Sequence, residues 1–330
     1  MPRSAAWLPL LILLRGTEVR IILVGASGFL GKHLLQALGR DNHQCVVLSR
    51  DINHCSTIGM IPGVKLVQAD VYDTDVLVKQ FTGADAIISM AGILNEKGRD
   101  GQGFHRVHVQ LVKGIIKACQ KTGVSRLLHV SALNAGMGNS HYLKTKGEAE
   151  RLLLTADGLN VTIFQPSVIF GRDDEFFNRF AGMLSLMPVM PLACPKAKLQ
   201  PVYAGDVVTV MLASLEDPMT WGKCYELGGP EVFTLKKLVE WTAKTIGKRR
   251  YIIGLPRSLS ATMAAIMDWV PGKPFSRDNY LSLQTDNIST QNGFAYFGVY
   301  PLSIDLVVPD YLTGSSHQRR LDNCRRQVRR

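Results

Sequence analysis

Short apolar runs alternate with longer amphipathic stretches through the first half of the chain. The apolar runs are rich in β-branched residues and predict strands at residues 19–24, 44–49, 64–68, 84–90, 126–131 and 161–164. Between them, apolar residues recur at helical spacing and predict helices at residues 28–38, 74–81, 104–121 and 141–155. Alternation of this kind is typical of a parallel sheet covered by helices. We therefore predict an α/β fold built on a doubly wound parallel sheet.

The pattern changes after Pro166, where Gly, Pro and Met become frequent. We expect the apolar segment 183–191 to cover a pocket rather than to extend the sheet. Helices are predicted at residues 206–215, 234–246 and 257–269, and we expect the last to pack against the first domain rather than to contact lipid. The predicted organisation is a leader at 1–18, a nucleotide-binding domain at 19–165, a smaller C-terminal α/β cap at 166–312 interleaved with it, and a basic disordered tail at 313–330.

A glycine-rich turn follows the first predicted strand and opens the first predicted helix. Its glycines, Gly25, Gly28 and Gly31, form the pattern G-x-x-G-x-x-G. In such a turn the first glycine permits a tight bend, the second lets backbone approach a pyrophosphate, and the third lets the helix pack close to the sheet. The helix N-terminus then offers free N–H groups to the phosphates. The pattern predicts a Rossmann-type domain whose dinucleotide contacts are Gly25, Ser27, Gly28, Phe29, Leu30 and Gly31.

The end of the second predicted strand indicates which dinucleotide is bound. An acidic residue at this position would bind the 2′-hydroxyl of NAD, but the chain has Ser49 and Arg50, followed by Asp51. Arg50 can pair with a 2′-phosphate and Ser49 can donate a hydrogen bond to it. NADP(H) is therefore favoured over NAD(H). Two alternatives remain open: Arg50 is a surface residue paired with Asp51, or Asp51 itself reaches the ribose.

Two further strand ends are predicted to border the cofactor. Asp70 and Val71 follow the third strand at the expected position of the adenine, and Ala91 and Gly92 follow the fourth, where small residues let the cofactor pass. These assignments rest on position alone.

The fifth predicted strand ends at Ser131, and the helix after it carries Tyr142 and Lys146. Residues four apart share one helical face. A nearby ammonium lowers the pKa of a phenol, so we predict that Tyr142 exchanges a proton with a substrate oxygen while Lys146 also holds the nicotinamide ribose. Ser131 would hydrogen-bond the same substrate oxygen.

The glycine turn, Ser131 and the pair Tyr142 and Lys146 resemble the short-chain dehydrogenase/reductase superfamily in its extended and atypical branch. The segments 142–148, 165–174, 176–180, 200–203, 206–207 and 274–278 further resemble the nucleotide-binding accessory subunit of respiratory complex I and its bacterial relatives. This resemblance covers residues 19 to about 312. It implies a tightly held NADPH in a structural role, with Pro166 and Val168 beside the nicotinamide and residues 200–202 where relatives meet a substrate. Along the sequence, Ser131 lies closer to Tyr142 than the corresponding serine and tyrosine do in many enzymes of the superfamily.

The charge of the chain is concentrated at its end. The formal net charge is +11, and six arginines against one aspartate in the last 12 residues supply five of those units. No basic stripe with interleaved aromatic residues occurs in the body, so we expect no nucleic-acid partner. A respiratory complex or a membrane surface remains an expected partner, on the cytoplasmic or matrix-equivalent side and peripheral to the inner membrane. The leader, apolar at residues 5–14, is read either as a short anchor or as a wrongly included start.

Six scattered cysteines without metal-ligand spacing indicate reduced thiols and no metal site. The sequence thus leaves open a structural NADP(H) binder, an active reductase or epimerase acting on a carbonyl, sugar-like, quinone or isoprenoid substrate, and a redox sensor.

Overall fold

The computed structural model describes residues 19–313 except 42, 53, 54, 56 and 272. The predicted leader at 1–18 and the tail from residue 314 lie outside the described residues.

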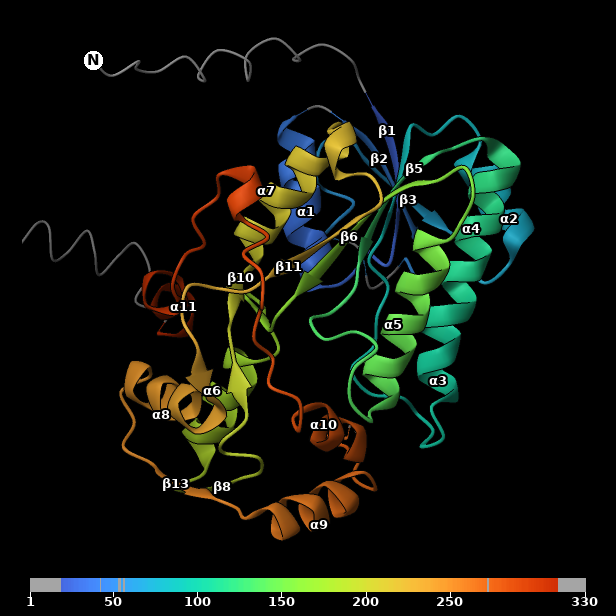
Figure 1. Ribbon diagram of the computed structural model, residues 1–330. Coiled ribbons are helices and arrows are strands. Elements are labelled where there is room, and N and C mark those ends of the chain that lie inside the picture. The colour runs from blue at the N-terminus through green and yellow to red at the C-terminus, as the bar shows by residue number, and fades with distance from the viewer. Residues whose placement is uncertain (1–18, 42, 53–54, 56, 272, 314–330) are drawn as a thin grey trace, which may run out of the picture.

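A parallel sheet of seven strands forms the centre of the larger lobe (Figure 1). Its strands are β1 (Arg20–Val24), β2 (Gln44–Ser49), β3 (Val64–Gln68), β4 (Ala86–Ser89), β5 (Arg126–Val130), β6 (Asn160–Pro166) and β11 (Lys223–Leu227). Their spatial order is β11-β6-β5-β4-β1-β2-β3, and every neighbouring pair is parallel. The order reverses between β1 and β4. A crevice at that reversal, outside the carboxyl ends of the strands, is where doubly wound sheets bind ligands.

Helices cover both faces of this sheet. On one face α1 (Phe29–Arg40) and α7 (Ala204–Leu215) bury Leu34, Leu38 and Met211 against the strands. The opposite face is covered by α2 (Thr74–Phe81), α4 (Leu111–Thr122) and α5 (His141–Leu154). Because both faces are covered, the strands are apolar on both sides, which explains why the sequence shows continuous apolar runs rather than alternation.

The smaller lobe has its own core, built from aromatic and aliphatic side chains such as Phe170, Phe177 and Leu238. Its strands are paired in three two-stranded sheets: β7 (Ile169–Phe170) with β10 (Val202–Tyr203), β8 (Val189–Leu192) with β13 (Tyr251–Gly254), and β9 (Lys198–Leu199) with β12 (Phe233–Thr234). Its helices are α6 (Phe177–Leu186), α8 (Leu235–Thr245), α9 (Arg257–Met267), α10 (Arg277–Ser282) and α11 (Ile304–Leu312). Short 3₁₀ turns lie at Pro218–Thr220 and Ala295–Phe297.

The predicted α/β class and doubly wound sheet are confirmed, and three details differ. The sheet gains β11, which the sequence did not predict and which brings a strand from the second half of the chain into the first lobe. The helix predicted at 104–121 is a composite: α3 (Gln102–Phe104), a π-helical segment (His105–Gln110) and α4. Segment 183–191 ends α6 and forms β8, a strand that the sequence did not predict, although, as expected, it does not extend the large sheet.

The helix predicted at 257–269 also behaves differently from expectation. It forms α9, but it packs on α10 rather than on the sheet domain, and only Ser260 and Ala264 of its residues are buried. Over the described ranges of the chain, no helix combines the length and hydropathy needed to cross a bilayer.

Candidate functional site

The glycine turn between β1 and α1 has the geometry that close approach to a ligand requires. Gly25 has a φ of +82°, and a Cβ built on it would lie 2.5 Å from the Cα of Ala91. A Cβ on Gly31 would lie 2.1 Å from the carbonyl oxygen of Ala26, which fixes how closely α1 packs on the turn. A Cβ on Gly28, in contrast, would meet nothing within 4 Å. Gly28 also caps α1 without a side-chain hydrogen bond, so this open space faces uncapped N–H groups. The turn therefore fits a dinucleotide pyrophosphate.

Two arginines meet at the carboxyl end of β2 and β3. The Arg50 guanidinium carbon lies 5.7 Å from the centre of the Tyr72 ring, and that of Arg106, from the π-helical segment, lies 4.4 Å from it. Both arginines are exposed. The Ser49 hydroxyl donates to the Asp51 carbonyl at 2.9 Å and accepts from the Asp51 amide at 3.3 Å. It therefore shapes the local turn, and the Arg50–Tyr72–Arg106 cluster supplies the positive charge at this edge.

The other predicted strand-end contacts lie along the same edge of the sheet. Asp70 is exposed and accepts a hydrogen bond from the Tyr72 amide at 3.1 Å, while Val71 is buried. Gly92 is exposed, and a Cβ built on it would lie 3.5 Å from Lys146 Nζ and 3.8 Å from His108 Nε2. The strand-end backbone at Gly92 thus borders the amine that the sequence predicted to contact the cofactor.

Lys146 is a buried cation. Its ammonium donates to the Val130 carbonyl at 3.0 Å, and Glu150 lies one helical turn further along α5. Burial lowers the pKa of Lys146 to about 8, and the Glu150 charge opposes this shift. The pKa of Glu150 is itself raised by burial, against the hydrogen bonds of Ser131 and Gln165. Gln165 Nε2 donates to both Glu150 oxygens at 2.8 and 2.9 Å.

Two buried histidines adjoin Lys146, and sequence reasoning missed both. His108 Nδ1 lies 2.9 Å from the Thr145 hydroxyl, which itself donates to the His141 carbonyl at 2.7 Å. The Nδ1 proton therefore points to Thr145, and Nε2 accepts from the Ile93 amide at 3.3 Å. Burial and the charge of Lys146 lower the pKa of His108 to about 2, so this imidazole is neutral. The available signal was a histidine on the buried face of a predicted apolar helix.

The second histidine, His129, lies on β5. Its Nδ1 is 3.2 Å from the Ser89 hydroxyl, whereas its Nε2 is buried and has no hydrogen-bond partner within the described part of the chain. Burial, and then the charge of Lys146, hold the pKa of His129 well below its usual value. The strand ends β4 and β5 and helix α5 thus surround Lys146 with neutral polar groups.

The environment of Tyr142 contradicts the predicted activation of this residue. Its ring packs edge-on against His108 at 5.5 Å and Phe104 at 6.2 Å between ring centres. Burial raises the pKa of Tyr142 to about 12, and the nearby Asp278 carboxylate raises it further. The expected lowering by Lys146 is therefore not found. The Tyr142 hydroxyl also makes no hydrogen bond to any residue that the structure describes, and the Asp278 carboxylate instead accepts from the His141 and Tyr142 amides at 2.6 and 3.1 Å.

The remaining predicted contacts are structural groups in this conformation. The Ser131 amide donates to the Phe164 carbonyl at 2.7 Å. The Ser131 hydroxyl is buried without a hydrogen bond of ordinary geometry, but it lies close enough to the Glu150 carboxylate to lower the pKa of Glu150. Pro166 ends β6 beside β11, and the Val168 carbonyl accepts from the Val202 amide at 3.0 Å. Gln200, in the region expected to meet a substrate, is held by Gly229 and Ser289.

Known proteins share this arrangement. A family of NAD(P)H-binding domains matches residues 25–177. The chain is 28% identical over 292 residues to subunit 9 of the alpha subcomplex of mitochondrial NADH dehydrogenase (ubiquinone) from Mus musculus, covering 86% of this chain and 76% of that protein. The chain is thus similar to NAD(P)H-binding domains and to this complex I subunit. These similarities support the predicted resemblance to the extended short-chain dehydrogenase/reductase superfamily and to the complex I subunit.

Solved structures show the same fold. A dTDP-glucose 4,6-dehydratase from Streptomyces venezuelae superposes with a TM-score of 0.71 at 17% identity, covering 90% of this chain and 97% of that one. An NADPH-dependent quinone oxidoreductase from Escherichia coli superposes with a TM-score of 0.69 at 18% identity, covering 89% and 98%. At such identities the likeness establishes the fold alone.

The lowered pKa of Lys146 predicts a pH-dependent effect on stability. Between about pH 8 and about pH 10 the unfolded chain binds a proton at this lysine that the folded chain releases, so the Lys146 contribution to the free energy of unfolding rises with pH. We expect the stability difference between wild type and Lys146→Met, both free of nucleotide, to shift towards wild type by about 2 kcal/mol over this range. Urea unfolding at several pH values measures it.

The comparison with Lys146→Met is needed because other groups titrate in the same range. The raised pKa values of the buried thiols of Cys45 and Cys119 act in the opposite direction, and they act equally in both proteins. A difference that does not change with pH would show that Lys146 is not a desolvated cation.

Proposed function

We propose that this protein binds NADP(H) in preference to NAD(H), holds it tightly, and serves as a structural or accessory subunit of a respiratory complex. It would act on the cytoplasmic or matrix-equivalent side, peripheral to the inner membrane. Its resident nucleotide would lie along the glycine turn, with Lys146 at the nicotinamide ribose. The observation that carries the accessory role is the environment of Tyr142, whose hydroxyl is unpaired among the described residues and whose pKa is raised to about 12.

A proton-exchanging tyrosine requires the opposite of this environment. General acid–base catalysis is most effective when the pKa of the catalytic group lies near the working pH. Asp278 adds negative charge beside the phenol, and Phe104 and His108 enclose its ring. Lys146, the cation expected to lower the pKa, is engaged with the Val130 carbonyl and is itself partly deprotonated near its pKa of about 8. These features support a site that binds a nucleotide without turning it over.

The preference for NADP(H) is supported by charge at the adenosine end of the site. The guanidinium carbons of Arg50 and Arg106 lie 5.7 and 4.4 Å from the centre of the Tyr72 ring. Arginine binds phosphate through charge-assisted hydrogen bonds, and two arginines around one aromatic ring give the adenosine a flat surface as well as a phosphate partner.

Replacing Arg50 by alanine tests this preference. We expect the dissociation constant for NADPH to increase by about tenfold or more, because a hydrogen bond to a charged group contributes about 1.5–3 kcal/mol, and the constant for NADH to change little. Lys65→Ala is the matched control, since Lys65 is an exposed cation on the neighbouring strand β3. Fluorescence titration with both nucleotides measures the effect. Equal losses for NADPH and NADH would contradict recognition of the 2′-phosphate.

Replacing Tyr142 by phenylalanine tests the accessory role. We expect the variant to retain its nucleotide through gel filtration and to keep its melting temperature, because the lost hydroxyl makes no hydrogen bond to a described residue. Lys146→Met provides the contrast, since it should release the nucleotide. The nucleotide is identified after denaturation, and its exchange with added NADPH is timed. An oxidation or reduction rate that wild type shows and Tyr142→Phe loses would contradict the accessory role.

That contrary outcome would favour a second function, a reductase or epimerase of the same superfamily acting on a carbonyl, sugar-like, quinone or isoprenoid substrate. One observation supports it: Lys146 is buried beside Gly92 and donates to the carbonyl of Val130, the residue before Ser131, and Tyr142 lies one turn earlier on α5. In that case a bound ligand would have to shield the Tyr142 hydroxyl from the negative charge of Asp278.

A further inference from the structure

The end of the smaller lobe farthest from the large sheet has an outer surface that is apolar. We call this surface the distal tip; it comprises the end of α6 with Met187, the strand pair β8 and β13, and α9 with its following turn at 268–270 (Figure 1). In β8 the side chains alternate, with Met190 and Leu192 in the core of the lobe and Val189 and Pro191 exposed. The paired strand β13 exposes Tyr251 and Ile253. The outer face of this sheet is thus apolar at all four positions.

An uncovered parallel sheet with such a face is unusual. Parallel strands in proteins are normally covered on both faces, because their residues are apolar on both sides. Here the exposed fraction is 78% for Tyr251 and 54% for Ile253, and Leu186, just before β8, is 85% exposed. Large contiguous apolar surfaces of this kind mark sites of interaction.

Helix α9 continues the same surface. It buries only Ser260 and Ala264, while Leu259, Ile266 and the following Trp269 and Val270 are exposed. Leu259 and Ile266, seven residues apart, lie on one side of α9, and Val270 lies in the turn beyond its last residue. A tryptophan beside such a stripe is typical of helices that lie in the boundary between water and lipid.

The distal tip carries mostly positive charge, and its one acidic residue, Asp268, is paired with Lys273 at 3.4 Å. Residues 241–267, which span the end of α8, β13 and α9, contain five cations and no aspartate or glutamate: Lys244, Lys248, Arg249, Arg250 and Arg257. Residues 176–205, which span α6 and β8, contain Arg179, Lys196 and Lys198 and again no acidic residue. An apolar surface bordered mainly by cations is complementary to an anionic surface that has an apolar interior.

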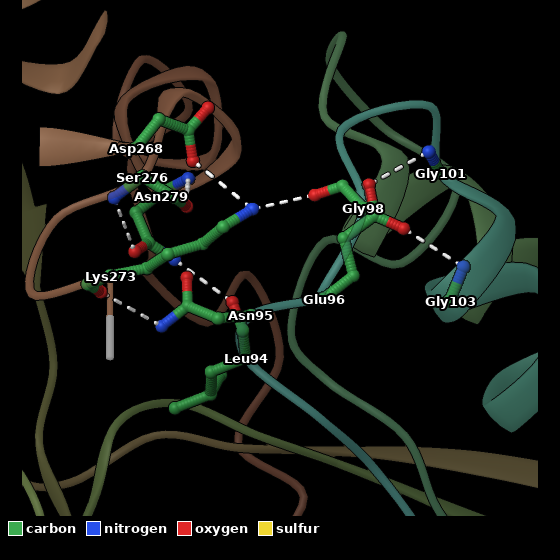
Figure 2. A network of polar contacts seen from close by, with 10 residues as sticks. All are labelled: Leu94, Asn95, Glu96, Gly98, Gly101, Gly103, Asp268, Lys273, Ser276 and Asn279. Carbon is green, nitrogen blue, oxygen red and sulfur yellow. Dashed lines mark hydrogen bonds and ion pairs between the residues drawn. The ribbon is translucent and has the colours of Figure 1, made fainter. Parts of the chain in front are cut away.

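A polar network fixes α9 to the larger lobe, so the tip is presented in one orientation (Figure 2). Lys273, just beyond α9, lies 3.4 Å from the Asp268 carboxylate and donates to the Gly98 carbonyl at 2.5 Å. Asn279 donates to the Leu94 carbonyl at 3.1 Å, and the Lys273 carbonyl accepts from Asn95 at 3.3 Å.

A cation–π contact adds to this network. The Arg99 guanidinium lies 3.4 Å from the centre of the Trp269 ring. Loop 94–103, which follows β4 of the nucleotide-binding sheet, is therefore tied directly to the distal tip.

We propose that the distal tip binds the surface of an anionic phospholipid bilayer. Its exposed apolar side chains enter the boundary between headgroups and acyl chains, and the surrounding lysines and arginines pair with lipid phosphates. The bilayer is contacted from one side and is not crossed. This inference rests on the proposed function in one respect, the peripheral location, and it identifies the residues that produce that location.

The test uses the full chain and vesicle flotation. Vesicles contain phosphatidylcholine alone or an equimolar mixture with phosphatidylglycerol. The tip variant carries Leu186→Glu, Tyr251→Glu and Ile266→Glu, and the control variant carries Met60→Glu, Tyr300→Glu and Leu306→Glu, which are exposed apolar positions outside the distal tip. We expect wild type and the control to float with the anionic vesicles, and we expect binding by the tip variant to fall by about tenfold or more.

Several outcomes would overturn the proposal. One is equal binding by the tip variant and the control, which would place any lipid contact elsewhere on the chain. Another is that wild type does not bind anionic vesicles but self-associates, and that the tip variant does not self-associate. The distal tip would then be an interface between two copies of the chain. Retained nucleotide is measured in the same samples. If wild type fails to bind lipid but retains its nucleotide, only the inference about the distal tip is rejected. If wild type floats with the vesicles but carries no nucleotide, the proposed function is rejected and this inference stands.

Discussion

Replacing Gly31 by alanine is expected to abolish nucleotide binding and to destabilise the larger lobe. The added Cβ would lie 2.1 Å from the carbonyl oxygen of Ala26 and 2.5 Å from its Cα, and both are backbone atoms that cannot move away as a flexible side chain can. Helix α1 would have to shift away from the turn, which displaces the N–H groups that would meet the pyrophosphate. Thermal unfolding and nucleotide titration measure the two effects.

Gly28→Ala is the matched control for this prediction. A Cβ at Gly28 meets nothing within 4 Å, and its φ of −81° suits any residue. We expect the nucleotide-free variant to unfold at the wild-type temperature and yet to bind nucleotide more weakly by tenfold or more, on the order of 1.4 kcal/mol or above, since the methyl group enters the space that backbone and pyrophosphate would share. If Gly28→Ala binds NADPH as wild type does, the pyrophosphate does not lie against this turn.

Replacing Arg126 by methionine is expected to lower the free energy of unfolding by about 3–5 kcal/mol. Arg126 is buried at the start of β5 and joins three elements through its guanidinium. Its nitrogens donate to Leu215 O at 3.0 Å, Asn160 O at 2.7 Å, Thr162 Oγ1 at 2.9 Å and Thr220 Oγ1 at 3.2 Å, and to Ser214 O. The substitution leaves several buried acceptors without a donor, and each such group costs about 1–3 kcal/mol.

Urea unfolding of three proteins checks this expectation. Arg126→Lys should be intermediate, because an ammonium keeps the charge but cannot reach acceptors on β6, the end of α7 and the 3₁₀ turn at Pro218–Thr220 together. Arg151→Met, at an exposed position on α5, should change stability by less than about 0.5 kcal/mol. A loss at Arg126 no larger than that at Arg151 would mean that the Arg126 hydrogen bonds do not hold the end of α7 and the 3₁₀ turn to the sheet.

Part of the candidate site could be predicted because its signals are local. The tight turn of Gly25, the helix start after Gly28 and the close packing at Gly31 all depend on residues within one turn of each other, so their spacing in the sequence carries the geometry. Tyr142 and Lys146 share a helical face for the same reason.

The pKa values of Tyr142 and Lys146 could not be predicted in the same way. Lys146 faces His108 and His129, which come from a π-helical segment and from β5, and Tyr142 faces Asp278, which is 136 residues away in the sequence. A pKa depends on burial and on every charge nearby, and no spacing along the chain records those neighbours. The predicted activation of Tyr142 failed for this reason.

The sequence by itself determined the repeated strands and helices of the first lobe, their burial on both sides, and the phosphate-binding turn, because apolar periodicity and glycine positions act over a few residues. Only the tertiary structure decided that β11 completes the sheet from the second half of the chain and that Arg126 joins the end of α7 and the 3₁₀ turn at Pro218–Thr220 to β6. It also decided that β8, β13 and α9 form one exposed apolar tip. Periodicity specifies which side chains of an element are apolar, whereas long-range folding of the chain determines whether protein or solvent covers them.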